Sequence, residues 1–217
     1  MRVILLGAPG SGKGTQAAGL AQQLKVARIS TGDIFRDEIT KKTELGTRAD
    51  EYVKSGRLVP DQLVLNMVFK RLDQSDCSGG FLLDGFPRTV DQAEGLNSYL
   101  AKKSLKIDYV FYLDVSEDVL IQRLSQRRHC PGCQMVYNLL TNPPQADSVC
   151  DRCGGKLISR GDDEPNTLKK RLMVYQELTS PLVAYYKASG HFAAIDGAKV
   201  AADVAQEIAG HLGGAKI

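Results

Sequence analysis

The most constraining feature of this chain is a glycine-rich stretch close to its N-terminus. Residues 7–15 read Gly-Ala-Pro-Gly-Ser-Gly-Lys-Gly-Thr; they follow the apolar run 3–6 and precede a helical pattern. Small residues let successive backbone N–H groups surround a phosphate, the next helix N-terminus adds partial positive charge, and Lys13 reaches the outer phosphates. This order predicts a nucleoside triphosphate site. The alternative is a tight turn that needs glycine for its backbone angles, but such a turn has no use for four glycines and a lysine.

The position after the lysine departs from the general pattern of such loops. That pattern places Ser or Thr directly after the lysine, where the hydroxyl binds magnesium. This chain has Gly14 there, and Thr15 follows one place later. The departure weakens the prediction that a loop hydroxyl is a magnesium ligand.

The size and composition of the chain limit the possible function classes. Its 217 residues are 43% hydrophobic and 24% charged, which suits one α/β domain with small insertions. A formal net charge of +3 is too small to indicate a nucleic acid or membrane partner unless basic residues gather locally. Because the sequence has neither a signal-peptide pattern nor a run of eighteen apolar residues, we expect a cytoplasmic protein.

Strand-like and helical patterns alternate along the chain. Strand-like runs occur at residues 2–6, 27–29, 81–83, 109–115 and 192–195, and helical patterns fill most of the intervals. This alternation predicts a parallel sheet with helices on both faces and ligands at the carboxyl ends of the strands. Residues 30–59 read as a small helical insertion that is a candidate moving flap. A long helix is expected from about residue 166, with Leu168, Leu172 and Leu178 facing inward.

Polar residues follow two of the predicted strands. Asp84 ends the third run, where an acidic residue can orient magnesium, although a solvated aspartate is the alternative. Arg88 comes four residues later and can bind a phosphate through two nitrogens. Gln92 could read the edge of a base or be an ordinary solvated helix residue. Thr31 and Arg36, beside a predicted helix N-terminus, could hold a second ligand or serve only the helix cap.

Three arginines gather near the middle of the chain. Arg123 and Arg127 are four residues apart, so we expect them on one helix face with Arg128 alongside. Because no carboxylate is near in sequence, an anionic ligand would offset their repulsion. A solvated basic face is the alternative.

Four of the five cysteines form two pairs. Cys130 and Cys133 are separated by sixteen residues from Cys150 and Cys153, a spacing that predicts a tetrahedral structural zinc site with no open position. A redox pair is the weaker alternative, since it does not need a second pair. Residues 136–144, between the pairs, suggest a small β hairpin, and metal binding would supply the stability that their few apolar residues cannot.

Taken together in order, these motifs closely resemble the adenylate kinase family from residue 1 to about 212. The motifs that carry the resemblance are the loop 7–15, Ser-Thr-Gly-Asp at 30–33, Arg57-Leu58-Val59, Asp84-Gly85-Phe86-Pro87-Arg88, Arg123 with Arg127, Arg160-Gly161-Asp162-Asp163, and Arg171. Gly14 after the lysine is the family's own variant of the loop.

The resemblance implies a fold, an activity and a division into parts. It implies a three-layer α/β/α core of the P-loop NTPase type with a five-stranded parallel sheet and two small insertions. The core would comprise residues 1–29, 60–125 and 164–217, with an AMP-binding flap at 30–59 and a zinc-binding lid at 126–163. The implied reaction is reversible transfer of the terminal phosphoryl group of MgATP to AMP, giving two ADP. We expect a monomer with no nucleic acid or membrane partner.

The resemblance also assigns residues to the two nucleotides. The implied ATP contacts are Gly10, Ser11, Gly12, Lys13, Gly14, Thr15, Arg127, Val136, Tyr137 and Lys199. The implied AMP contacts are Thr31, Arg36, Arg57, Leu58, Val59, Gly85, Phe86, Pro87, Arg88, Gln92, Arg160 and Arg171. A catalytic clamp on the phosphates would consist of Lys13, Arg88, Arg123, Arg127, Arg160 and Arg171, with Asp84 on the magnesium side. Phosphoryl transfer needs little more than such positioning and charge stabilisation.

Two other functions stay open at this point. A kinase for UMP, CMP or GMP would share most of these motifs, and Thr31 and Gln92 favour AMP by resemblance. A nucleotide-regulated protein could instead grip nucleic acid with the zinc unit. Residues 129–160 are nearly balanced in charge and lack interleaved exposed aromatics, which argues against that second function.

Overall fold

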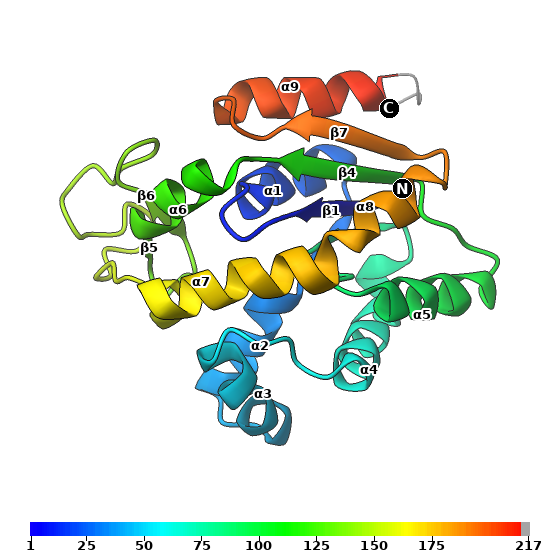
Figure 1. The fold of residues 1–217 in the computed structure, drawn as a ribbon, viewed down its shortest axis with the longest axis horizontal. Helices are drawn as coiled ribbons and strands as arrows, with labels where there is room; N and C mark the ends of the chain where they lie inside the picture. The colour runs from blue at the N-terminus through cyan, green and yellow to red at the C-terminus, as the bar shows by residue number, and fades with distance from the viewer. Residues whose placement is uncertain (214–217) are drawn as a thin grey trace.

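The computed structural model describes residues 1–213, so residues 214–217, the end of the expected core, lie outside the described residues. Its centre is a parallel five-stranded sheet in the order β2-β3-β1-β4-β7 (Figure 1). The strands are β1 (Arg2–Gly7), β2 (Ala27–Ser30), β3 (Phe81–Asp84), β4 (Tyr109–Asp114) and β7 (Phe192–Asp196). The predicted fold class and all five strand-like runs are therefore confirmed.

Helices cover both faces of this sheet. Helices α1 (Lys13–Leu24) and α9 (Ala201–Leu212) pack on one face, against Val3 and Leu5 of β1. Helices α4 (Asp61–Leu72), α5 (Val90–Ala101) and α8 (Pro181–Lys187) pack on the other, against Ile4 and Leu6. Because both faces are buried, β1 is a continuous apolar run rather than an alternating one.

Residues 30–59 form a helical insertion that extends from the core (Figure 1). Helices α2 (Thr31–Thr40) and α3 (Glu44–Lys54) begin at Ser30 and Thr43, whose hydroxyls accept hydrogen bonds from Asp33 N and Gly46 N. The two helices approach so closely that a Cβ on Gly46 would lie 2.1 Å from the Glu38 carbonyl oxygen. Glycine is therefore required at this crossing.

Residues 126–163 form the cysteine-containing insertion. Helix α6 (Glu117–Ser125) leads into β5 (Arg127–His129), which pairs with β6 (Val136–Asn138) in an antiparallel ribbon. The expected hairpin between the cysteine pairs is present as a tight turn closed by an antiparallel bridge between Asn138 and Asn142. The sequence did not predict that β6 also pairs with β5, in a ribbon that encloses the first cysteine pair. The short helix η2 (Gly161–Asp163) returns the chain to α7 (Pro165–Val174).

Helix α7 crosses the front of the molecule from the cysteine-containing insertion towards α8 (Figure 1). A π-helical turn, η3 (Tyr175–Thr179), joins the two helices. Leu168 and Leu172 are buried as expected, but the inward prediction for Leu178 is wrong, since its side chain is exposed and Thr179 is buried instead. The wider π turn shifts the helix face by about one residue.

Two further features complete the fold. A short helix, η1 (Ser75–Cys77), precedes β3 and buries Cys77 in the core. Within residues 1–213, every helix is too short or too polar to cross a bilayer.

Candidate active site

The loop 7–13 has the geometry of an anion cradle. Gly10 and Gly12 have φ angles of +87° and +98°, a region that side chains disfavour, and Gly12 stands directly before α1. Lys13 folds back over the loop, where its Nζ donates hydrogen bonds to the carbonyl oxygens of Gly7 at 2.6 Å and Ala8 at 2.8 Å. The N-terminus of α1 and this ammonium group therefore meet at one place.

The charge state of Lys13 depends on its surroundings. Burial lowers its pKa from 10.5 to about 7, although the carboxylate of Asp84 raises it; Arg88, Arg171 and Arg127 lower it further. A bound phosphate would reverse this balance and favour the ammonium form.

Asp84 lies beside the loop at the carboxyl end of β3. A Cβ on Gly14 would stand 3.7 Å from its Oδ2, and the residue is 7% exposed. Arg28 Nη2 forms an ion pair with that oxygen at 2.8 Å and approaches Asp33 Oδ2 at 3.3 Å. The solvated alternative for Asp84 is therefore wrong. Arg28 was missed by the sequence reasoning, since only the pairing of β2 with β3 brings it next to Asp84.

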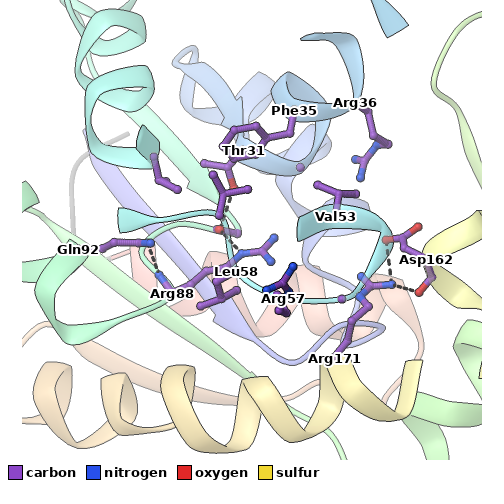
Figure 2. A pocket seen from close by; sticks show the side chains of 15 residues that line it. Thr31, Phe35, Arg36, Val53, Arg57, Leu58, Arg88, Gln92, Asp162 and Arg171 are labelled. Carbon is purple, nitrogen blue, oxygen red and sulfur yellow. Dashed lines mark hydrogen bonds and ion pairs between the residues drawn. The ribbon is translucent and has the colours of Figure 1, made fainter. Parts of the chain in front are cut away.

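A cavity opens between the helical insertion and the core (Figure 2). Its apolar part is formed by Phe35, Val53, Leu58, Val59 and Val64, and its polar part includes Thr31, Arg36, Arg57, Gly85, Arg88, Gln92, Asp162 and Arg171. Nine of the twelve predicted AMP contacts line it. These are Thr31, Arg36, Arg57, Leu58, Val59, Gly85, Arg88, Gln92 and Arg171. Phe86 is fully buried in the core nearby, and Pro87, which follows a cis peptide bond, is also buried.

Gln92 is held rigidly in the wall of this cavity. It is 1% exposed, so the solvated alternative is wrong. Its Oε1 accepts a hydrogen bond from Arg88 N at 2.8 Å, and its Nε2 donates to Asp61 Oδ1 at 2.7 Å (Figure 2 shows the first). Asp61 Oδ2 also accepts from Thr89 Oγ1 at 2.9 Å. Asp61 begins α4 and was not predicted as part of the site.

Arg88 is fixed by the backbone around it. Its Nε donates to the carbonyl oxygen of Gly85 at 2.8 Å, and Thr31 Oγ1 donates to the same oxygen at 2.8 Å. Thr179 Oγ1 donates to the Arg88 carbonyl at 2.8 Å. Burial, and then the charge of Arg171, lower the pKa of Arg88 to about 10. Its guanidinium thus stays charged at neutral pH in a crowded positive environment.

The expected helix face carrying Arg123 and Arg127 is absent from α6, because the helix ends at Ser125 and Arg127 belongs to β5. Carboxylates are also near: Arg127 Nε donates to Asp163 Oδ2 at 2.7 Å, and Asp163 Oδ1 also pairs with Arg171 Nη1 at 2.9 Å. Among residues 1–213, Arg128 donates to backbone carbonyl oxygens and to no carboxylate. The sequence reasoning missed the carboxylates because they are more than thirty residues away.

Arg160 and Arg171 lie with Arg127 around the two aspartates of η2. Arg171 Nη1 reaches Asp162 Oδ2 at 2.9 Å. Burial, followed by the charges of Arg127 and Arg36, lowers the pKa of Arg160 to about 9. The buried Nε atoms of Arg160 and Arg36 have no hydrogen-bond partner among residues 1–213. These spare donors suit an anionic ligand.

Arg123 of the predicted clamp and several predicted ATP contacts have partners outside this cluster. Arg123 donates from Nη1 to the carbonyl oxygen of Gly197 at 2.7 Å, beside the loop that follows β7. Lys199 in that loop pairs with Glu207 at 2.8 Å and is exposed. Val136 is exposed, whereas Tyr137 is buried and its hydroxyl contacts Cys150 Sγ at 3.5 Å. The Tyr137 side chain therefore packs inside the cysteine-containing insertion.

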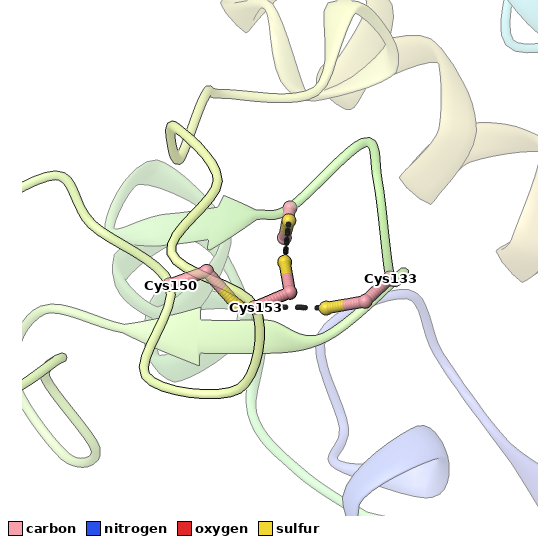
Figure 3. Close-up of side chains that lie close together, drawn as sticks. Cys133, Cys150 and Cys153 are labelled. Carbon is pink, nitrogen blue, oxygen red and sulfur yellow. Dashed lines mark hydrogen bonds between the residues drawn. The ribbon is translucent and has the colours of Figure 1, made fainter.

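The four cysteine sulfurs converge on one point (Figure 3). All four Sγ atoms lie within 4.8 Å of one another, with 3.4 Å between Cys130 and Cys153 and 3.5 Å between Cys133 and Cys150. Tetrahedral metal–sulfur bonds of about 2.3 Å place sulfurs ~3.8 Å apart, so the donor set fits such an ion. The four cysteines therefore form a candidate metal site.

Comparisons with known proteins agree with this geometry. The sequence model described as adenylate kinase matches residues 5–191, most of the chain. The chain belongs to the adenylate kinase family. It is 47% identical to an adenylate kinase of Lachnoclostridium phytofermentans over 98% of both chains, and 48% identical to one of Syntrophomonas wolfei over 96% of this chain and 97% of that one. An adenylate kinase of Moorella thermoacetica is 49% identical over 92% of both.

Membership of the adenylate kinase family identifies the class of chemistry. The chain is a nucleoside monophosphate kinase, a phosphotransferase that binds ATP and AMP and uses magnesium with ATP. The predicted recognition and reaction class are thereby confirmed.

Proposed function

We propose how this chain carries out the family reaction, reversible transfer of the terminal phosphoryl group of MgATP to AMP, giving two ADP. The observation that carries the proposal is the polarity of the cavity beneath the helical insertion. One part is apolar and includes the fixed amide of Gln92. The other part contains arginines whose charges act on Lys13. A nucleoside monophosphate has the same two-part character, with a flat base and a doubly charged phosphate.

ATP binds with its phosphates in the loop 10–15. The backbone N–H groups of Gly10, Ser11, Gly12, Lys13, Gly14 and Thr15 and the N-terminus of α1 hold the inner phosphates, and the Lys13 ammonium holds the outer ones. Asp84, next to Gly14, orients the magnesium that accompanies ATP. Lys199 and Val136-Tyr137 contact the adenosine side through their backbone, since the Lys199 and Tyr137 side chains have other partners.

AMP occupies the cavity with its base at the apolar part. Thr31, Leu58, Val59 and Gln92 surround the base, while Arg36, Arg57, Arg88 and Arg171 attract the phosphate. Gly85, Phe86 and Pro87 shape the floor from the end of β3. The phosphate of AMP therefore faces the outer phosphate of ATP across Lys13.

Transfer needs positioning and charge rather than a general base. The attacking AMP phosphate is ionised at neutral pH, so no proton has to be removed. Lys13, Arg88, Arg123, Arg127, Arg160 and Arg171 place positive charge around the oxygens of the transferring group. Burial is the main cause of the lowered pKa values of Arg88 and Arg160, and the charges of neighbouring arginines lower them further. Bound phosphates would offset both effects.

Two mobile parts close over a core formed by residues 1–29, 60–125 and 164–217. Residues 30–59 are the AMP-binding flap, and residues 126–163 are the lid that brings Arg127 to the phosphates. Closure excludes water, which would otherwise compete with AMP as the acceptor. The four cysteines hold a structural zinc ion in the lid, because four sulfur ligands leave no position for catalysis.

The composition of the chain also bears on its oligomeric state, its cellular compartment and its partners. We infer a monomer in the cytoplasm without nucleic acid or membrane partners, in keeping with its small net charge. Size-exclusion chromatography with light scattering tests the oligomeric state, and retention on a nucleic acid column at physiological salt would contradict the partner assignment.

The decisive test is an assay with the purified chain, ATP, magnesium and each nucleoside monophosphate in turn. We expect two ADP per AMP consumed, and much slower reaction with UMP, CMP and GMP. The variant Lys13→Met is the control for contaminating kinase. Formation of no ADP from AMP would overturn the proposal.

A further inference from the structure

The amide of Gln92 can take only one orientation. Asp61 presents a carboxylate, which only accepts hydrogen bonds, and the backbone N–H of Arg88 only donates. Nε2 must therefore face Asp61 Oδ1 at 2.7 Å, and Oε1 must face Arg88 N at 2.8 Å. A flipped amide would oppose acceptor to acceptor and donor to donor at two partly buried contacts. The chemistry of the two partners thus decides which end of the amide is oxygen and which is nitrogen.

Asp61 is itself fixed and does not line the cavity. Its Oδ2 accepts from Thr89 Oγ1 at 2.9 Å, and the Thr89 hydroxyl in turn accepts from the backbone N of Gln92 at 3.1 Å. Asp61 stands at the start of α4, and Thr89 caps α5. The carboxylate thus joins two core helices behind the cavity wall, and reaches the cavity only through Gln92.

The fixed amide leaves a defined pair of groups for a ligand. Of the two Nε2 hydrogens one goes to Asp61, and of the two Oε1 lone pairs one goes to Arg88 N. One donor and one acceptor are left on the amide, in a fixed order. The Watson–Crick edge of adenine offers a 6-amino donor beside the N1 acceptor, whereas hypoxanthine and guanine offer a 6-oxo acceptor beside an N1–H donor. The two edges therefore require opposite amide orientations.

We propose that Asp61 is a positioning residue that makes this enzyme select a 6-aminopurine monophosphate over a 6-oxopurine monophosphate, by preventing the Gln92 amide from flipping. The inference rests on the proposed function, since it takes the base of the monophosphate to lie against Gln92. Sites that hydrogen-bond a substrate group discriminate strongly against analogues that mispair there, because buried polar groups are then left unpaired. Asp61 supplies one of the two contacts that oppose the flip, and the backbone of Arg88 supplies the other.

The isosteric variant Asp61→Asn tests the proposal, because an asparagine amide can donate to or accept from Gln92. AMP and IMP are compared as phosphoryl acceptors, and their binding is measured by calorimetry without ATP. IMP differs from AMP at the 6-position and N1 only. We expect the AMP-to-IMP ratio of kcat/KM to fall by about tenfold, the size of effect that one relieved buried mismatch produces. The KM for AMP should rise while kcat changes little.

Asp73→Asn is the matched control. Asp73 at the end of α4 also accepts hydrogen bonds from the α5 side, from Tyr99 at 2.7 Å and from Lys103. It therefore joins the same two helices but lies away from the cavity. We expect its AMP-to-IMP ratio to equal that of the wild type. Both values of kcat/KM in a ratio are measured on the same enzyme sample. A variant with a smaller folded fraction therefore lowers both values equally and leaves their ratio unchanged.

The outcomes separate the two proposals. If the wild type phosphorylates AMP but the ratio is unchanged in Asp61→Asn, or falls equally in Asp73→Asn, the role of Asp61 is refuted and the proposed function stands. A wild type that uses IMP as well as AMP also refutes it. If the wild type phosphorylates neither, the proposed function itself fails.

Discussion

Lys13 combines a central position in the phosphate loop with an unusually acidic ammonium group. Its pKa is lowered to about 7, first by burial. At pH 8 the free enzyme therefore holds Lys13 mostly neutral, and bound phosphates favour the charged form. We expect nucleotide binding to take up about one proton at pH 8 and much less at pH 6. Titration calorimetry in buffers of different ionisation enthalpy measures this uptake.

The control for this titration is Lys13→Met, which has no group to protonate. Its proton uptake at pH 8 should vanish together with most of the affinity for ATP. Equal uptake by the variant and the wild type would show that another group titrates.

Arg127 is positioned by a carboxylate rather than left free. Its pairing with Asp163 links it to Arg171, on the other side of that carboxylate. We expect Arg127→Ala to lower kcat by about 100-fold or more, the typical loss when one charge-stabilising donor is removed, with little change in the KM for AMP. Steady-state kinetics check this.

The neighbouring Arg128→Ala is the matched control, since within the described part of the chain Arg128 donates only to the carbonyls of Ser125 and Arg127. It should keep kcat within about twofold of the wild type. If Arg127→Ala turns over as fast as Arg128→Ala, Arg127 does not act on the transferring group.

Individual residues were predictable where the local chain decides their place. Lys13 follows directly from its loop, and Arg88 from the end of β3. Arg28, Asp61 and Asp163 were not predictable in the same way, because each acquires its partner through strand register, helix packing or a long return of the chain. The sequence showed only that these residues are charged and lie near the end of a strand or the start of a helix, which does not identify their partners.

At the level of elements, we expect the cysteine-containing insertion to depend on a bound metal ion for its stability. Its buried cluster consists only of Cys130, Tyr137, Cys150 and Leu157 among residues 1–213, too small a core to be stable alone. We expect one zinc per chain by metal analysis. Cys133→Ser should lose that zinc and lower the Tm by roughly 10 °C, since structural zinc contributes strongly to folding.

The fifth cysteine supplies the comparison. Cys77 is buried in the main core and far from the cluster in sequence, so Cys77→Ser should retain the full zinc content. Hydrogen exchange should speed up within residues 127–160 in Cys133→Ser only. Stoichiometric zinc in Cys133→Ser, or none in the anaerobically purified wild type, would contradict the assignment.

The main elements were predictable because their patterns are strong. The apolar run of β1 and the helical spacing in α1 each satisfy one clear period. The prediction failed where short segments depend on distant partners. β6 has three residues and pairs with β5 across the first cysteine pair, a partner that its own residues do not indicate. The π turn before α8 moves Leu178 outward without any sign in the apolar pattern.

At the scale of the whole molecule, the two insertions border one space. Arg36 of the helical insertion and Asp162 of η2 line the same cavity. A ligand with an adenosine at each end of a polyphosphate should contact the loop, the cavity and both insertions at once. We expect saturating amounts to raise the Tm by roughly 10 °C and to reduce the radius of gyration.

Thermal unfolding and small-angle X-ray scattering measure these two effects. ATP alone and AMP alone are the controls, and each should give a smaller shift because it engages only one insertion. A two-headed ligand that stabilises no better than ATP would show that the sites are not adjacent.

Helix α7 and the π turn that follows it connect the cysteine-containing insertion to the wall of the cavity. At one end Arg171 forms ion pairs with the two aspartates of η2. At the other end Thr179 donates a hydrogen bond to the Arg88 carbonyl, and the Arg88 N–H donates to the amide of Gln92. A tilt of α7 would thus move η2, at the end of the cysteine-containing insertion, and the cavity wall around Arg88 at the same time. Substitutions in α7 and the π turn that leave Arg171 and Thr179 in place would then change how strongly binding of one nucleotide affects binding of the other.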